Sequence, residues 1–239
     1  MKPVTHGRKF NRWLWAPIVM VAVGLIAWHS SFAQEAPVKI PAPAKDVPLA
    51  AQSGEATAVV AGGCFWGMQG VFEHVKGVKQ VLAGYSGGTV ANPGYEQVSS
   101  GTTGHAESIQ IKYDPSQVTY GTLLQVYFSV AHNPTELNYQ GPDQGTQYRS
   151  AIFYSTDEQK QVAQAYIAQL DAAGAYSARI VTETTAFTAF YPAEDYHQDY
   201  LIHHPDSMYI AFNDLPKVDN LKTMFPQLYM DKPVMVSSN

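Results

Sequence analysis

The feature that most constrains the fold is that the 239-residue chain contains a single cysteine, Cys64. A lone thiol cannot close an intramolecular disulfide, so the fold has to be stabilised by a hydrophobic core. Apolar residues make up 46% of the sequence, an ordinary share for a globular protein of this length. The sequence therefore predicts one large or two small globular domains, in which Cys64 does something other than cross-link the chain.

The first 33 residues differ from the rest of the chain. A basic stretch, MKPVTHGRKFNR, leads into the uncharged run WLWAPIVMVAVGLIAW and then into HSSFAQ. This pattern is typical of a secretory signal peptide that is cleaved after Ala33, and it predicts an exported, periplasmic protein. The apolar run contains Pro17 and is shorter than the roughly 20 residues of a spanning helix, but an uncleaved membrane anchor is the alternative.

The charge of the chain limits its partners. Removing the four basic residues of the leader takes the formal net charge from −5 to −9. Such a balance argues against a surface that binds nucleic acid or anionic membranes.

The remaining sequence indicates a linker followed by one domain. Residues 34–55 are rich in Pro and Ala and lack apolar periodicity, which predicts an extended linker before a domain at 56–239. The strand-like segments are 57–61, 78–85, 105–115, 150–155 and 178–185. Helical spacing occurs from Met68 to Val75, with Gly77 as a C-cap, and at 123–131 and 155–174, the last with a capping box of Ser155 and Glu158. This mixture predicts a single α+β domain with a mainly antiparallel sheet.

Cys64 lies where the first predicted strand turns into a helix, in the stretch AVVAGGCFWGMQG. A cysteine in the first helical turn faces unpaired backbone N–H groups and the positive end of the helix dipole, and both favour the thiolate. This is a suitable position for a nucleophile. The alternative at this point is that Cys64 is a small buried apolar residue, the commoner role of a free cysteine.

Six blocks of the sequence carry a resemblance to a known family. They are GCFWG at 63–67, GYSGG at 84–88, NPGYEQV at 92–98, TGHAE at 103–107, DQGTQYRS at 143–150 and FYPAEDYHQDYL at 190–201. In this order they resemble the type A peptide methionine sulfoxide reductases and span nearly the whole domain. The resemblance implies a ferredoxin-like α/β core with irregular additions, and reduction of the S epimer of methionine sulfoxide, free or in proteins.

The resemblance also implies a role for each matching residue. Cys64 would attack the sulfoxide sulfur, Glu107 would be the acid, and Tyr95 and Tyr148 would donate hydrogen bonds to the oxygen. This division suits the chemistry, because the reaction needs a nucleophile, an acid and donors to the departing oxygen. Burial among aromatic groups would raise the pKa of Glu107 enough for it to act as an acid.

Other residues of the six blocks would shape the substrate pocket or support it. Phe65 and Trp66 would hold the S-methyl group, and Asp143 would line the pocket through the substrate backbone or a water molecule. His197 is expected to be a structural, hydrogen-bonding histidine outside the catalytic set. No metal and no cofactor is predicted, and the domain is expected to be a monomer.

The chain departs from many relatives in having no second cysteine in its C-terminal tail. The sulfenic acid left on Cys64 after methionine departs therefore cannot form an internal disulfide. An external thiol is expected to reduce it, whether a thioredoxin-like domain, a glutaredoxin system or a small thiol.

Four other functions compete with this one. A zinc deaminase shares the H-x-E pattern of residues 105–107 but needs two further cysteine ligands, so it is discarded. A cysteine hydrolase or acyltransferase would use His74, His105 or His197 as a base, although no signature supports any of them. A one-cysteine peroxidase, and a binding domain with an incidental thiol, complete the alternatives.

Overall fold

A six-stranded sheet lies at the centre of the computed structural model, which describes Met1 and residues 36–236. The predicted signal peptide falls outside the described residues. The strand order is β7-β6-β1-β3-β2-β8, and every neighbouring pair is antiparallel except β6 and β7. The strands are β1 (Ala56–Ala61), β2 (Val78–Ser86), β3 (Ala106–Tyr113), β6 (Ala151–Tyr154), β7 (Glu183–Ala186) and β8 (Phe190–Pro192). The predicted α+β class with a mainly antiparallel sheet is confirmed.

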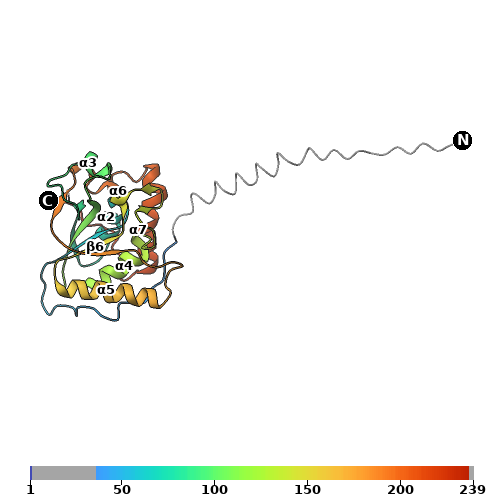
Figure 1. The fold of residues 1–239 in the computed structure, drawn as a ribbon. Coiled ribbons are helices and arrows are strands. Elements are labelled where there is room, and N and C mark those ends of the chain that lie inside the picture. Colours follow the sequence, from blue (N-terminus) through green and yellow to red (C-terminus); the bar gives the residue numbers. More distant parts are fainter. Residues whose placement is uncertain (2–35, 237–239) are drawn as a thin grey trace. The chain divides into compact units, whose positions relative to one another are not determined.

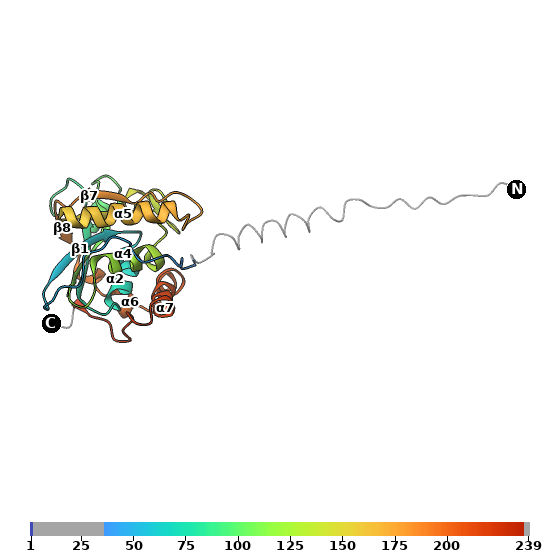
Figure 2. The ribbon, with the colours of Figure 1, turned by 90° about the horizontal axis from the view of Figure 1, so that it is seen from below.

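The helices pack mainly on one face of this sheet. They are α2 (Phe65–Glu73), α3 (Tyr95–Ser99), α4 (Tyr120–Val126), α5 (Asp157–Ala172), α6 (Tyr200–His203) and α7 (Leu215–Met224). Shorter turns are η2 (Tyr127–Ala131), η3 (Thr146–Tyr148), η4 (Asp195–His197) and η5 (Ile210–Asp214), and β4 (Tyr139–Gln140) pairs with β5 (Asp143–Gln144). Helix α4 continues into the π-helical turn η2 and lies beside α5, whereas α2 contacts α6 and α7 (Figure 1 and, from below, Figure 2).

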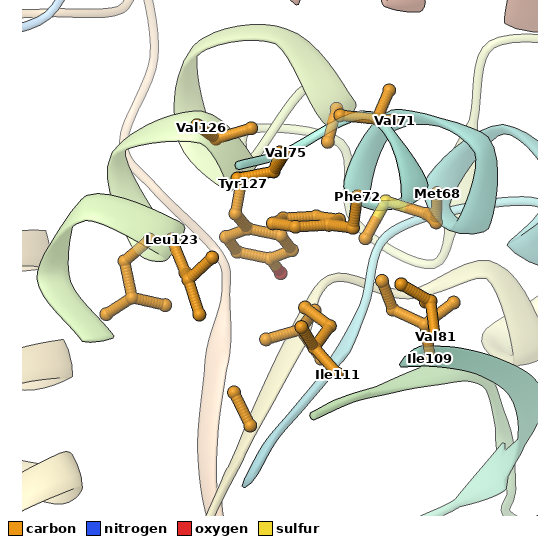
Figure 3. Close-up of a cluster of buried hydrophobic side chains, with 14 of the residues drawn as sticks. Met68, Val71, Phe72, Val75, Val81, Ile109, Ile111, Leu123, Val126 and Tyr127 are labelled. Carbon is orange, nitrogen blue, oxygen red and sulfur yellow. The ribbon is translucent and has the colours of Figure 1, made fainter. Parts of the chain in front are cut away.

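The core forms between α2, η2 and the sheet. Met68 and Phe72 of α2 lie over Ile109 and Ile111 of β3, next to the ring of Tyr127, as Figure 3 shows. Alternate residues of a strand point to the same face, so the side chain at position 107 belongs to this helix-covered face as well. The strand pattern therefore directs a carboxyl group into the core beneath α2.

Two predicted helix boundaries are wrong by a few residues. The N-cap of α5 is Thr156, whose side chain accepts a hydrogen bond from the Gln159 N–H at 3.1 Å, while the Gln159 side chain accepts from the Ser155 N–H at 2.8 Å. The capping interaction is thus one residue later than the predicted Ser155 and Glu158. Helix α2 ends at Glu73, and Gly77, with φ of +91°, lies in the turn before β2.

Part of the predicted linker packs on the domain. Residues 36–55 contain no helix or strand, but residues 38–46, here called the strap, run along α4 and α5. Ile40 is 7% exposed in the main core. The Tyr166 hydroxyl of α5 donates to the Pro41 carbonyl at 2.6 Å, and Asp46 accepts from the Gly121 N–H of α4 at 2.8 Å. The strap is a packed part of the fold although it has no periodic apolar pattern.

Shortening the buried side chain of the strap should destabilise the protein. Ile40→Ala removes core contacts, so we expect the free energy of unfolding to fall by about 2 kcal/mol, measured by urea denaturation. Leu49→Ala is the matched control, because Leu49 lies nearby in the sequence but is 55% exposed, and a change within about 0.5 kcal/mol is expected. Equal effects of the two substitutions would contradict a packed strap.

Candidate active site

A glycine pair places Cys64 at the turn between β1 and α2. A Cβ atom on Gly62 would lie 2.7 Å from Cγ of His132. One on Gly63, where φ is +90°, would lie 2.5 Å from Cγ of Gln140. Carbon atoms cannot approach this closely, so both positions require glycine. The packing of His132 and Gln140 therefore determines where the first turn of α2 begins.

The register of β1 and β3 brings Glu107 to the same turn. Ala61, the last residue of β1, pairs with Ser108, so Glu107 lies beside the turn that follows. Its side chain is 2% exposed, and its Oε2 accepts a hydrogen bond from the Phe65 N–H at 3.1 Å. Burial, opposed by this hydrogen bond and reinforced by two nearby aspartates, raises the pKa of Glu107 to about 8. At neutral pH Glu107 is therefore a carboxylic acid that can donate a proton.

The environment of Cys64 favours the thiol over the thiolate, contrary to the sequence-based expectation. Cys64 is the N-cap of α2, and the backbone N–H of Trp66 acts to lower the thiol pKa. Burial has the larger effect, and the charges of Glu107, Asp214 and Asp143 add to it, so the pKa of Cys64 lies well above its ordinary value. The helix terminus alone does not determine the thiol pKa, because the charges of three carboxyl groups from distant segments also act on it.

An aromatic cluster, here called the aromatic wall, is formed by Phe65 and Trp66, which follow Cys64, together with Tyr200 and Tyr209. Trp66 stacks on Tyr200 with ring centroids 3.9 Å apart, and the ring of Tyr209 meets Trp66 edge-on at 5.9 Å. Phe65 is 1% exposed, and its ring centroid lies 6.5 Å from that of Trp66. The two residues predicted to hold a methyl group are thus adjacent, with Trp66 as the more accessible of the pair.

His197 supports this wall. Its Nδ1 accepts a hydrogen bond from Trp66 Nε1 at 3.1 Å, so the other ring nitrogen carries the proton of the neutral form. Burial lowers the pKa of His197, against the charge of Glu194, and favours the neutral ring. These contacts are those of a residue that orients Trp66, in line with the structural role expected for it.

Two tyrosines complete the predicted set. Tyr95 begins α3, and its ring centroid is 4.6 Å from that of His197, whereas Tyr148 ends η3. Burial raises the pKa of each hydroxyl, and the negative charges of Glu107 and Cys64 add to this effect. Both hydroxyls are therefore neutral hydrogen-bond donors that lie within electrostatic range of the thiol and the acid. The structure brings all seven predicted site residues together.

Asp143 is the most accessible of the carboxyl groups around Cys64. It lies on β5 and is partly exposed, whereas Glu107 and Asp214 are 2% and 0% exposed. Burial raises the pKa of Asp143, while a hydrogen bond from the Tyr209 hydroxyl to its Oδ2 lowers it.

Asp214 is a residue of this neighbourhood that sequence reasoning missed. It ends η5, and its Oδ1 lies 3.2 Å from Nζ of Lys217, while burial raises its pKa to about 6. A Cβ atom on Gly67 would lie 2.1 Å from the same Oδ1. The second glycine of GCFWG is thus a signal in the sequence that another group approaches this helix turn closely, although it does not say which group.

The C-terminal segment contributes the other residues that were not predicted. Tyr200, Tyr209 and Lys217 all follow the last sequence block or lie at its end, in a region without clear periodicity. Among residues 36–236, no cluster of three or more His, Cys, Asp or Glu side chains is arranged to hold a metal ion.

Comparisons with known proteins give a consistent result. The sequence model of a family described as peptide methionine sulfoxide reductase matches residues 56–228. "Peptide methionine sulfoxide reductase MsrA 2" of Mesorhizobium japonicum is 63% identical over 188 residues, which cover 79% of this chain and 96% of that protein. A protein of the same name from Synechocystis sp. is 55% identical over 195 residues, covering 81% and 89%. The solved structure of methionine sulfoxide reductase A of Corynebacterium diphtheriae matches with a TM-score of 0.56 at 34% identity, covering 72% of this chain and 88% of that one.

Proposed function

The chain belongs to the peptide methionine sulfoxide reductase family, and from this premise we propose that Cys64 and Glu107 carry out the reduction of the S epimer of methionine sulfoxide. The observation that carries the proposal is the junction at the start of α2. There the backbone of Phe65 binds the Glu107 carboxyl group directly after the thiol-bearing residue.

The protonation states of the two groups define a reaction in which electrons and protons balance. Glu107, neutral at pH 7, gives its proton to the sulfoxide oxygen as the sulfur of Cys64 bonds to the substrate sulfur. The Glu107 carboxylate takes the thiol proton in the same step, so Cys64 enters the new S–S bond as a thiolate and its sulfur is left neutral. The oxygen transfers to Cys64, which becomes a sulfenic acid, and the substrate leaves as methionine.

The other residues bind the oxygen and the S-methyl group of the sulfoxide. Tyr95 and Tyr148 donate hydrogen bonds to the oxygen as its charge grows. Trp66, with Phe65 behind it, covers the S-methyl group, and its stacking on Tyr200 keeps the indole in place.

An external thiol restores the enzyme, because the sequence contains one cysteine. A first thiol attacks the sulfenic sulfur, releasing water and forming a mixed disulfide with Cys64. A second thiol releases Cys64 and leaves as an oxidised disulfide. A thioredoxin-like protein, a glutaredoxin system or a small thiol would each satisfy this chemistry.

The location and assembly of the protein are part of the same proposal. The leader pattern of residues 1–33 supports export to the periplasm with cleavage after Ala33, leaving a monomer in which the strap packs on the domain at 56–239. Within residues 36–236, no helix combines the length and apolar character needed to cross a membrane. The N-terminal residue of protein recovered from the periplasm tests the cleavage.

The activity is tested with the purified full-length protein. Without reductant, we expect one equivalent of methionine per protein from the S epimer of methionine sulfoxide, because the single Cys64 is used once. Dithiothreitol should turn this burst into continuous turnover, and the R epimer should give neither. Consumption of hydrogen peroxide without methionine formation would instead identify a peroxidase, and tight sulfoxide binding without turnover would identify a binding domain.

A further inference from the structure

We propose that Glu194 is a positioning residue of this active site. Its carboxylate fixes the backbone of Tyr95, so that the Tyr95 hydroxyl meets the sulfoxide oxygen together with the proton of Glu107. This role rests on the proposed function and deepens it, because it says what holds one of the two hydrogen-bond donors in place. Glu194 belongs to the sequence block FYPAEDYHQDYL.

Tyr95 lies in a part of the chain that the core holds weakly. Helix α3 has five residues, its buried residue is Val98, and it belongs to the glycine-rich connection at 87–104. A helix this short gains little from its own hydrogen bonds, so its position has to come from contacts with other segments. The Tyr95 hydroxyl must nevertheless be held to within about 0.5 Å if it is to stabilise charge on the oxygen.

The carboxylate of Glu194 joins α3 to strand β2. Its Oε1 accepts a hydrogen bond from the Tyr95 N–H at 2.8 Å, and its Oε2 accepts one from the Tyr85 hydroxyl at 3.0 Å. Tyr85 is fully buried in β2 and pairs across the sheet with Glu107 of β3. One side chain thereby connects the hydrogen-bond donor to the strand position that lies beside the acid.

The backbone on either side of the Glu194 side chain is fixed independently of α3. Strand β8 pairs with β2 just before it, and the Ala193 N–H then donates to the Ala83 carbonyl at 2.9 Å. The carbonyl of Glu194 accepts from the His197 N–H at 2.9 Å, which begins the turn η4. The position of the carboxylate therefore follows from the pairing of β8 with β2, and not from the connection that it binds.

The two donors favour the ionised form of Glu194. Burial acts to raise its pKa, but hydrogen bonds from the Tyr95 N–H, from its own backbone and from the Tyr85 hydroxyl act against burial, and the pKa lies below its ordinary value. An ionised carboxylate only accepts hydrogen bonds, so it can satisfy both donors at once. A glutamine has one acceptor oxygen and one NH2 group, so one of the two donors would face another donor.

A single turnover measures the reaction at the sulfoxide oxygen. The full-length protein is mixed without reductant with the S epimer of methionine sulfoxide at several concentrations, and methionine is quantified over time. For Glu194→Gln we expect the maximal rate to fall about tenfold, since a misplaced donor stabilises the growing charge on the oxygen less well. The half-saturating substrate concentration should stay within about twofold, because the residues around the S-methyl group are unchanged.

Combination with Tyr95→Phe shows whether Glu194 acts through this tyrosine. Tyr95→Phe removes the hydroxyl and should lower the maximal rate about 10- to 100-fold. In this background Glu194→Gln should lower the rate by less than about twofold more, because no hydroxyl is left to position. Alkylation of Cys64 by iodoacetamide involves no sulfoxide oxygen, so its rate should match the wild type in both single variants and in the double variant.

Two further variants complete the test. Glu96→Gln is the matched control, because it removes the exposed carboxylate that follows Tyr95 in α3, and it should leave the maximal rate within about twofold of the wild type. Tyr85→Phe examines the same link if Glu194→Gln does not fold. It leaves Oε2 of Glu194 without its donor and should lower the maximal rate about threefold, but not in the Tyr95→Phe background.

The possible outcomes are distinct. A wild-type rate in Glu194→Gln, or in Tyr85→Phe if that variant has to replace it, would overturn the positioning role. Equal slowing with and without the Tyr95 hydroxyl, or slower alkylation of Cys64, would do the same. Failure of the wild-type protein to form methionine would overturn the proposed function itself.

Discussion

Replacing Cys64 by serine is expected to abolish methionine formation, both in the single turnover without reductant and in continuous turnover with dithiothreitol. A serine hydroxyl is a much weaker nucleophile than a thiol and cannot accept the oxygen as a sulfenic acid does. The loss should therefore be at least about 10,000-fold. Methionine is quantified by chromatography after the protein is mixed with an excess of the S sulfoxide.

The serine variant should still fold and bind its substrate. The substitution changes one atom in a position where the backbone is determined by the neighbouring glycines, so the urea midpoint should match that of the wild type. Trp66 is part of the proposed substrate pocket, so quenching of its fluorescence by methionine sulfoxide is a convenient measure of binding. Methionine formation by Cys64→Ser within tenfold of the wild-type rate would refute the role of this thiol.

Replacing Glu107 by glutamine is expected to slow methionine formation about 100- to 1,000-fold in the single turnover. The amide keeps the shape and can accept the Phe65 hydrogen bond, but it cannot transfer a proton. Because the pKa of Glu107 is about 8, the wild-type rate should be highest below this pH and fall as the carboxyl group ionises above it. The variant should lack this decline, which quenched-flow measurements from pH 6 to pH 10 would show.

The Glu107→Gln variant should be more stable than the wild type at neutral pH, although it is less active. The carboxyl group ionises near its ordinary pKa of about 4 in the unfolded chain but near 8 in the folded protein, so folding becomes less favourable as the pH rises between these values. Glu107→Gln should therefore raise the free energy of unfolding by up to about 3 kcal/mol at pH 7.

A surface residue provides the comparison for Glu107. Glu158→Gln alters an exposed carboxylate in the first turn of α5 and should change neither the rate nor its pH profile. An unchanged rate in Glu107→Gln at pH 7 would refute its role as the acid. A slow variant that is also strongly destabilised would point to a structural role for the carboxyl group.

The sequence predicted the parts of the site that depend on local pattern. The GG pair before Cys64, the alternation of β3 and the helical spacing after Cys64 each follow from the positions of a few neighbouring residues. The family blocks then named Tyr95, Glu107 and Tyr148 together, which no periodicity could have done. The α+β fold class was also predictable, because the strand-like and helical segments of the sequence do not alternate strictly.

The parts that escaped prediction depend on tertiary packing. Asp214 is 150 positions from Cys64, and its effect on the thiol pKa arises because η5 packs against α2. The packing of the strap is not visible in the sequence, because its contacts are made through backbone groups, one aspartate and one buried isoleucine, which leave no repeating pattern. The N-cap of α5 is Thr156 and not the predicted Ser155. Both residues have hydroxyls that can cap a helix, so the two starting points differ little in free energy.

The pairing of Ala61 with Ser108 determines where the Glu107 carboxyl group lies relative to Cys64. Inserting or deleting one residue within β3 would put Ala106 or Ser108 where Glu107 now stands, and would turn the carboxyl group to the opposite face of the sheet. The glycine-rich connection at 87–104 precedes the paired segment, but it carries Tyr95 in α3. A change in length is therefore expected to abolish activity in β3 through the register, and in the connection wherever it displaces Tyr95.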